Sequence, residues 1–173
     1  GLKSMATLKD VKTKISAVKK TQQITKAMNM VAASKLRGAQ ASMEGFRPYS
    51  SKFAEVLGSL AEKAGEETNP LLEVREEVEK VHLVLCTSDR GLCGGFNANL
   101  ITKAKAFKKE KEAQGIEVIF TNFGKKGRDW CRKNKFERVK EYLGVVGANF
   151  GFNVASSAGQ KLINGFLDKT YDE

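Results

Sequence analysis

A glycine-rich turn carries the residues with the clearest chemical potential. It spans residues 88–97, with the sequence SDRGLCGGFN, between an apolar run and a helical pattern. Proteins built from alternating strands and helices bind phosphate groups at such turns, through the N–H groups that begin the helix. The spacing matches neither G-x-G-x-x-G nor the G-K-[S/T] of a P-loop, so a nucleotide site has weak support. A tight turn and a protein-contact loop that presents Asp89 and Arg90 remain the other interpretations.

The single histidine and the three cysteines are the other side chains that could do chemistry. His82 and Cys86 are four residues apart and would therefore share one face of a strand. The spacing of His82, Cys86, Cys93 and Cys131 fits no compact zinc module. One histidine at the start of a strand also offers little to a Ser-His-Asp triad. We expect no metal, no cofactor and no catalytic residue, and we expect the cysteines to be buried free thiols in a reducing, cytosolic setting.

These residues need strands and helices to position them. Residues 81–87 (VHLVLCT) and 116–122 (IEVIFTN) are short apolar runs rich in β-branched residues, which predicts strands buried on both faces. A third, poorer strand is predicted near 138–143. Helical patterns follow the strands in three places: 100–107, a short stretch around Trp130, and 152–170. This alternation predicts an α/β fold with a parallel sheet, and we expect at least one further strand beyond the last residue.

The first third of the chain has a different pattern. From residue 7 to about residue 64, one stripe of positions recurs at steps of three and four, a period of about 3.5 residues that is typical of a helix wrapping another helix. We call this stripe the seam. It is apolar at both ends and polar or small in its middle. The apolar positions that define it are Val11, Ile15, Val18, Leu36, Met43 and Phe46.

Three local signals shape this long helix. Thr7 and Asp10 predict a weak capping box at its start. The polar middle of the seam, which includes Gln22 and Thr25, lowers the stability of a coiled coil but leaves room for another contact. Pro48 predicts a bend because it lacks an N–H group and crowds the preceding turn. The helix is expected to end near Gly65.

Charge and composition narrow the classes of partner that the chain could bind. The net charge of +10 and the pI of about 9.5 favour an anionic partner: nucleic acid, an anionic membrane surface or an acidic protein. The lysines between residues 7 and 40 have no interleaved aromatic residues, so a solvated basic face is the default interpretation. No uncharged apolar stretch is long enough to cross a bilayer. We divide the chain into a cloning remnant and start at 1–5, the long helix at 6–65, a linker at 66–80 and an α/β domain at 81–173.

Three stretches resemble, in this order, the γ subunit of bacterial F-type ATP synthase: TQQITKAMNMVAASKLRGAQ (21–40), FRPYS (46–50) and TSDRGLCGGFN (87–97). The resemblance implies that the N-terminal helix pairs with a C-terminal helix as an antiparallel coiled coil. It also implies a Rossmann-like α/β domain, incomplete here because members of the family are longer. The implied function is that of a central-stalk rotor, which couples rotation driven by proton or sodium flow to the catalytic β subunits and performs no chemistry itself.

The resemblance also implies partners and contact residues. The partners are the α and β subunits of F1, the ε subunit and the c-ring of Fo, with no nucleic acid. Membrane association occurs only through the complex, at the cytoplasmic face of the bacterial inner membrane. The seam would face the partner helix. The implied contacts with the α/β ring are Gln22, Ile24, Thr25, Lys26, Met28, Asp89, Arg90, Gly91, Leu92, Cys93, Gly94 and Gly95.

Overall fold

A computed structural model describes residues 7–63, 70–73, 75–145 and 151–173. The chain divides into two compact units, Gly1–Lys63 and Ala64–Glu173, which we describe separately. The predicted remnant at 1–5 lies outside the described residues, as do Gly65 and part of the predicted linker.

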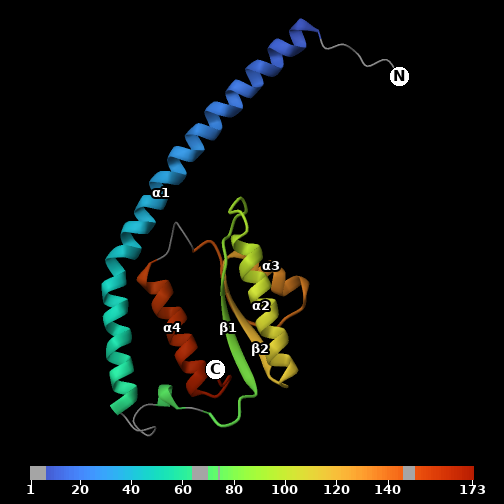
Figure 1. Ribbon diagram of the computed structural model, residues 1–173. Coiled ribbons are helices and arrows are strands. Elements are labelled where there is room, and N and C mark those ends of the chain that lie inside the picture. Colours follow the sequence, from blue (N-terminus) through green and yellow to red (C-terminus); the bar gives the residue numbers. More distant parts are fainter. Residues whose placement is uncertain (1–6, 64–69, 74, 146–150) are drawn as a thin grey trace. The chain divides into compact units, whose positions relative to one another are not determined.

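The first unit is one helix, α1, which spans Leu8–Lys63 and contains 56 residues. The predicted capping box begins it: the Asp10 carboxylate accepts hydrogen bonds from the Thr7 N–H (3.0 Å) and hydroxyl (2.7 Å), and the Asp10 N–H donates to Thr7 Oγ1. These bonds lower the pKa of Asp10 because they favour its charged form. The helix continues through Pro48, and Figure 1 shows that it curves without a break.

The second unit is a three-stranded sheet with helices, as the sequence predicts. Its strands pair in the order β1-β2-β3 and all run parallel. Val81 aligns with Val118, and Phe123 aligns with Tyr142 after a register shift in β2. The elements are η1 (Pro70–Leu72), β1 (Lys80–Cys86), α2 (Phe96–Ala113), β2 (Glu117–Phe123), α3 (Lys125–Lys133), β3 (Arg138–Tyr142) and α4 (Phe152–Leu167).

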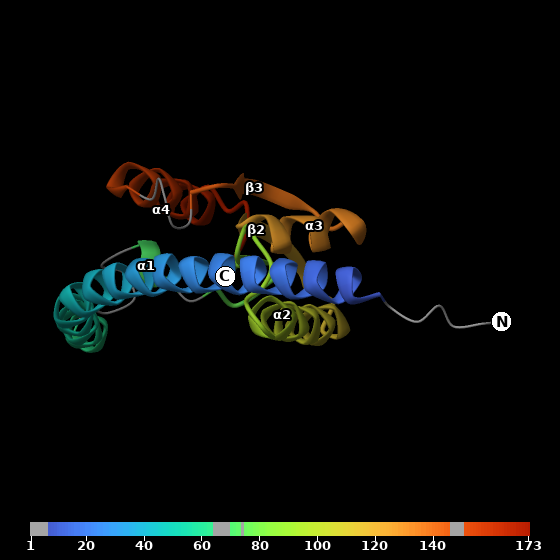
Figure 2. The same cartoon turned by 90° about the horizontal axis from the view of Figure 1, so that it is seen from above.

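The core of this unit forms where α2 and α3 pack on one face of the sheet. Phe120 is fully buried and packs edge-on against Trp130, with ring centroids 5.7 Å apart. Val118 and the buried Cys131 complete this cluster, and burial raises the pKa of the Cys131 thiol. Figure 2 shows α2 and α4 on opposite sides of the sheet. Strand β2 is therefore covered on both faces, which explains why five consecutive residues, from Val118 to Asn122, are buried.

The last residues of the chain lie along β1. The His82 N–H donates to the Glu173 carbonyl (2.7 Å), and the Asp172 N–H donates to the Lys80 carbonyl (2.8 Å). The Arg75 guanidinium holds this segment through the Tyr171 carbonyl and the Asp172 carboxylate, each at 2.7 Å. Arg75 and the N–H groups that bond to Asp172 lower the pKa of that carboxyl.

The prediction that all three cysteines are buried is wrong for two of them. Cys131 is buried, Cys93 is half-buried and Cys86 is exposed. Cys86 is exposed because it is the last residue of a strand at the edge of the sheet. All three are free thiols.

Candidate partner-binding site

The glycine-rich turn joins β1 to α2 at the carboxyl end of the sheet, where Asp89 fastens it to its neighbours. The Asp89 carboxylate accepts hydrogen bonds from the N–H of Lys125, at 3.1 Å, and from the N–H of Gly144, at 3.1 Å and 3.2 Å to its two oxygens. Those two residues follow β2 and β3. Asp89 therefore links the loops after all three strands, and its carboxylate is already engaged within the chain.

Asn97 braces the turn from the other side. Its side-chain oxygen accepts a hydrogen bond from the Ser88 N–H at 3.0 Å, and its side-chain nitrogen donates to Ser88 Oγ at 2.8 Å. The same nitrogen lies 3.0 Å from Cys93 Sγ. Reasoning from the sequence missed this role of Asn97, although an asparagine in the first turn of a helix is a common partner for backbone groups. The turn is thus a braced loop with a defined shape.

The tip of the turn faces solvent. Arg90, Gly91, Leu92, Gly94 and Gly95 are exposed, and Cys93 is half-buried. Leu92 is 102% exposed and has φ 63°, a left-handed conformation that costs a branched side chain about 1–2 kcal/mol. The braced loop therefore holds an apolar side chain fully in solvent, beside the exposed Arg90.

The second glycine turn, GKKG, has a structural role. Gly124 has φ +89°, and a Cβ there would lie 2.1 Å from the Thr87 carbonyl oxygen. A Cβ at Gly127 would lie 2.9 Å from the side-chain oxygen of Asn122. The Gly127 N–H also donates to the Thr87 hydroxyl at 2.8 Å. Both glycines therefore permit close packing between the loops after β1 and β2.

The predicted contact residues of α1 fall on two stripes. Gln22, Thr25 and Lys26 line one shallow hollow of the helix surface, whereas Ile24 and Met28 form an exposed apolar stripe beside it. The Thr25 hydroxyl bonds to a carbonyl of its own helix. Lys26 is exposed and forms no ion pair within the described part of the chain. The polar groups at this hollow include the amides of Gln22 and Asn29 and the ammonium of Lys26.

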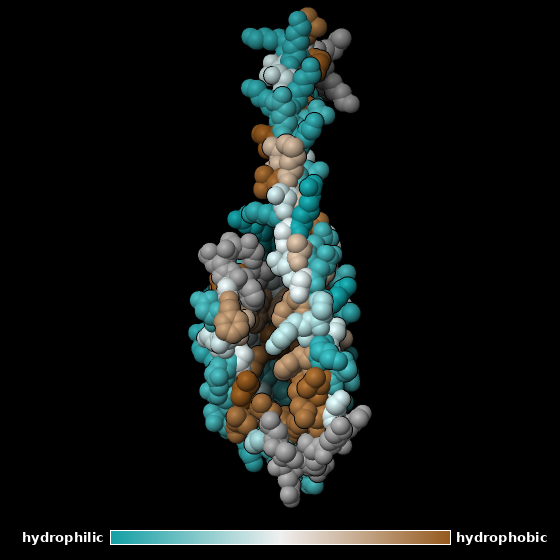
Figure 3. All heavy atoms as spheres, turned by 90° about the vertical axis from the view of Figure 1, so that its left-hand side faces the viewer, coloured by the Kyte–Doolittle hydropathy of each residue, from teal (hydrophilic) through white to brown (hydrophobic). Residues whose placement is uncertain are grey.

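The apolar seam is exposed along α1. Figure 3 shows separate apolar groups among polar ones on the N-terminal part of the helix. Exposure at this level is unusual for apolar side chains that recur on one helix face. The exposed fractions at the six seam positions are Val11 45%, Ile15 51%, Val18 61%, Leu36 58%, Met43 52% and Phe46 60%.

A metal-ligand cluster and a bilayer-spanning helix are both absent from the ranges that the structure describes. Among residues 7–63, 70–73, 75–145 and 151–173, no group of three or more His, Cys, Asp or Glu side chains could hold a metal ion. Within the same ranges, no helix is both long enough and apolar enough to cross a bilayer.

Comparison with known proteins assigns the family. A family profile described as ATP synthase matches residues 7–173. The ATP synthase gamma chain of Desulfosudis oleivorans is 68% identical over 170 residues, and that of Desulforapulum autotrophicum is 63% identical over 169 residues. The chain belongs to the ATP synthase gamma-chain family. The matches cover 98% of this chain and 57% and 56% of those two relatives, so the chain spans a little over half of their length.

The fold of this gamma-family chain also has a solved counterpart. A chain in the cryo-EM structure of the Euglena gracilis mitochondrial ATP synthase, which contains OSCP, F1 and the c-ring, matches with a TM-score of 0.53 at 20% identity. The match covers 88% of this chain and 46% of that one. The predicted fold class, a long N-terminal helix followed by a Rossmann-like α/β domain, is thereby confirmed.

Proposed function

We propose that this gamma-family chain forms part of the central-stalk rotor of an F1Fo ATP synthase. In this role it couples rotation, driven by proton or sodium flow, to the conformational cycle of the catalytic β subunits. The observation that carries the proposal is α1, a helix of 56 residues with exposed apolar ends and a polar middle on one seam. Membership of the gamma-chain family supports the same role for this helix.

The seam supports one half of a coiled coil. Its exposed apolar side chains recur at the period that a second helix would cover, so pairing would remove them from water. A C-terminal helix of the same protein is the proposed partner of α1. In the polar middle of the seam, α1 would pack less tightly against its partner helix. This segment would therefore be the part of α1 most available for contact with the surrounding ring.

Three surface features are proposed to touch the α/β ring. Two lie on α1: the hollow with Gln22, Thr25 and Lys26 and the stripe with Ile24 and Met28. The third is the turn 89–95 of the α/β unit, where the exposed Arg90 and Leu92 would make the main contacts. An exposed ion pair to Lys26 would contribute only about 0–1 kcal/mol. Weak contacts suit a shaft because tight ones would stall rotation.

The proposed subunit has no chemistry of its own. Its partners are the α and β subunits, the ε subunit and the c-ring, and it reaches the membrane only through that complex. The location is the cytoplasmic face of a bacterial inner membrane, in line with the bacterial sources of the relatives. ATP turnover belongs to the β subunits in this proposal, so the chain alone binds no ATP.

Co-purification with a ring tests the proposal. This chain is co-expressed with the α and β subunits of Desulfosudis oleivorans ATP synthase, and assembly is measured by size-exclusion chromatography and native mass spectrometry. We expect the chain to co-elute with α and β, and we expect Lys26→Glu and Leu92→Asp each to lower its share of the complex. The matched control is Lys109→Glu, a charge reversal at an exposed lysine on α2 that should leave assembly unchanged.

The results discriminate between functions. If the chain fails to co-elute, or if Lys109→Glu lowers assembly as much as Lys26→Glu, the proposed contacts are wrong. Calorimetry of the chain alone with ATP provides the second arm. Saturable ATP binding that Gly94→Val abolishes would instead favour a nucleotide-dependent enzyme.

A further inference from the structure

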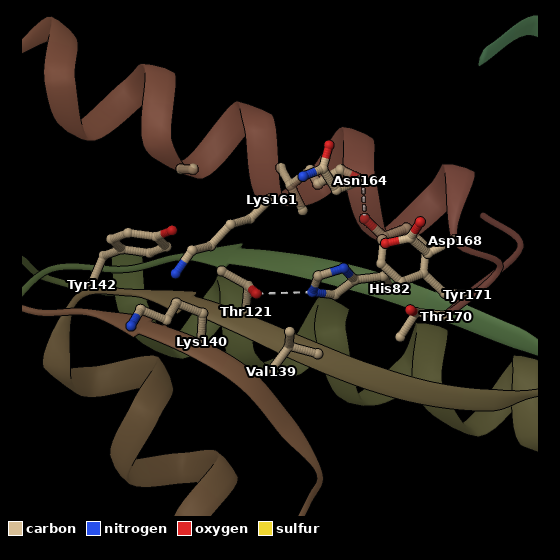
Figure 4. A pocket seen from close by; sticks show the side chains of 13 residues that line it. His82, Thr121, Val139, Lys140, Tyr142, Lys161, Asn164, Asp168, Thr170 and Tyr171 are labelled. Carbon is tan, nitrogen blue, oxygen red and sulfur yellow. Dashed lines mark hydrogen bonds between the residues drawn. The ribbon is translucent and has the colours of Figure 1, made fainter. Parts of the chain in front are cut away.

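A cavity separates α4 from the sheet in the α/β unit. Its volume is about 330 Å³, at the lower end of the size of small-molecule sites. His82 and Thr121 supply its floor from β1 and β2, and β3 and α4 supply its sides (Figure 4). Val139, Ala158, Leu162 and Gly165 make much of the lining apolar. The glycine-rich turn and the α1 surfaces have no part in this cavity.

Two residues that line the cavity each carry a buried polar atom without a partner among the described residues. His82 Nε2 lies 2.8 Å from Thr121 Oγ1, while the other ring nitrogen, Nδ1, is buried and has no hydrogen bond there. The Tyr142 hydroxyl is also buried and unpaired in the same part of the chain. A buried polar atom without a partner is unfavourable, so two such atoms on residues that line one cavity call for a common explanation.

Two lysines reach the same cavity from different elements. Lys140 comes from β3 and Lys161 from α4. Figure 4 shows the Lys161 side chain extending toward the space between Tyr142 and Thr121. Neither lysine forms an ion pair within the part of the chain that the structure describes. Asp168, the carboxylate of the cavity, lies toward its opposite end, near Tyr171.

We propose that this cavity binds a small organic anion. A carboxylate or phosphate would lie between the ammonium groups of Lys140 and Lys161 and accept a hydrogen bond from the Tyr142 hydroxyl. The apolar or planar body would lie against Val139 and Leu162, with a polar atom bonded to His82 Nδ1. Ammonium and phenol groups are donors at neutral pH, which is why an anionic acceptor fits them and a cation does not.

The charged end and the apolar body are tested with separate probes. Phenyl phosphate and phenylacetate carry both features, inorganic phosphate carries only the charge, and benzyl alcohol carries only the ring. Binding is followed by the backbone amide shifts of the full ¹⁵N-labelled chain. We expect saturable shifts around His82, Thr121 and Lys161 with one or both aryl anions, and affinity lower by about tenfold for phosphate and for benzyl alcohol. The stronger of the two aryl anions identifies the preferred acidic group.

Variants tie the binding to named atoms. Lys161→Gln and Lys140→Gln should each lower the affinity for the preferred aryl anion by about tenfold, whereas Lys169→Gln, a neighbouring exposed lysine outside the cavity, should not. Tyr142→Phe keeps the ring stacked on Phe123, 4.6 Å between centroids, and removes only the hydroxyl. It should weaken binding without lowering the melting temperature. The proposal is overturned if no aryl anion gives saturable shifts, if benzyl alcohol binds equally well, or if Lys169→Gln has the effect of Lys161→Gln.

Discussion

Replacing Gly124 with alanine should destabilise the α/β unit far more than the same change at Gly94. Both glycines have positive φ, at +89° and +56°. A Cβ added at Gly94 would meet no atom within 4 Å, so only the left-handed backbone counts against alanine there, at about 1 kcal/mol. At position 124 the backbone (φ 89°, ψ 150°) lies in a region that is essentially restricted to glycine, and the Cβ would lie 2.1 Å from the Thr87 carbonyl oxygen.

The larger cost at Gly124 follows from what must move. The Thr87 backbone can retreat only by disturbing its N–H bond to the Phe123 carbonyl, 2.7 Å, and the bond from the Gly127 N–H to its hydroxyl, 2.8 Å. Each such bond is worth about 1 kcal/mol and the strained backbone about 1–3 kcal/mol more. We therefore expect Gly124→Ala to cost about 4 kcal/mol, which corresponds to a fall of about 15 °C or more in melting temperature.

Tryptophan fluorescence provides a readout confined to this unit. Trp130 is the single tryptophan of the chain and packs against Phe120 and Phe136, so its emission reports the core beside α3 and not α1. Urea unfolding of the wild type, Gly94→Ala and Gly124→Ala gives the two free-energy differences directly. Equal losses at the two positions would refute the reasoning, because the contact with Thr87 would then contribute nothing.

Three further predictions concern other parts of the molecule. Arg75→Ala should lower the free energy of unfolding in urea by about 3 kcal/mol, because the arginine side chain is only 9% exposed and its removal takes the ion-pair partner from the Asp172 carboxylate, which keeps its bonds from the Glu79 and Lys80 N–H groups; no change would contradict that role. Burial lowers the pKa of His82, so the unfolded chain binds a proton more readily than the folded one, and the free energy of unfolding should fall as the pH decreases below the unfolded pKa of about 6.5. His82→Gln should flatten this dependence of the unfolding free energy on pH in urea titrations at pH 5–7. An unchanged pH dependence would count against the prediction. The exposed seam should make the chain self-associate in light scattering, and Leu36→Lys with Phe46→Lys should reduce the association; a strictly monomeric wild type would be the opposite result.

The secondary structure of this chain could be predicted because local patterns dominate it. The β-branched runs at 81–87 and 116–122 form β1 (Lys80–Cys86) and β2 (Glu117–Phe123), each displaced by one residue, and the capping pair Thr7–Asp10 begins α1. The order of these elements was enough for a parallel α/β unit, since crossovers between parallel strands need intervening helices. The family, too, was visible in the sequence, because it rests on two long motifs, TQQITKAMNMVAASKLRGAQ and TSDRGLCGGFN.

The candidate surfaces were only partly predictable. The helical period alone places Gln22 and Lys26 near each other. The sequence of the glycine-rich turn suggested that Asp89 and Arg90 could both be available to a partner. The Asp89 carboxylate instead bonds to N–H groups that follow β2 and β3. A partner contact at Arg90 and Leu92 stays a prediction.

What the sequence determined by itself is local: the length of α1, the period of its seam, the strands, the turns and the family. Tertiary structure alone decided which distant residues meet. Thr87 meets Gly124, Arg75 meets Asp172, and His82 shares a cavity with Lys161, across separations that no pattern of neighbouring residues encodes. The physical reason is that helical and strand periods follow from backbone geometry within a few residues, whereas these contacts depend on the register of the sheet and on how its helices pack.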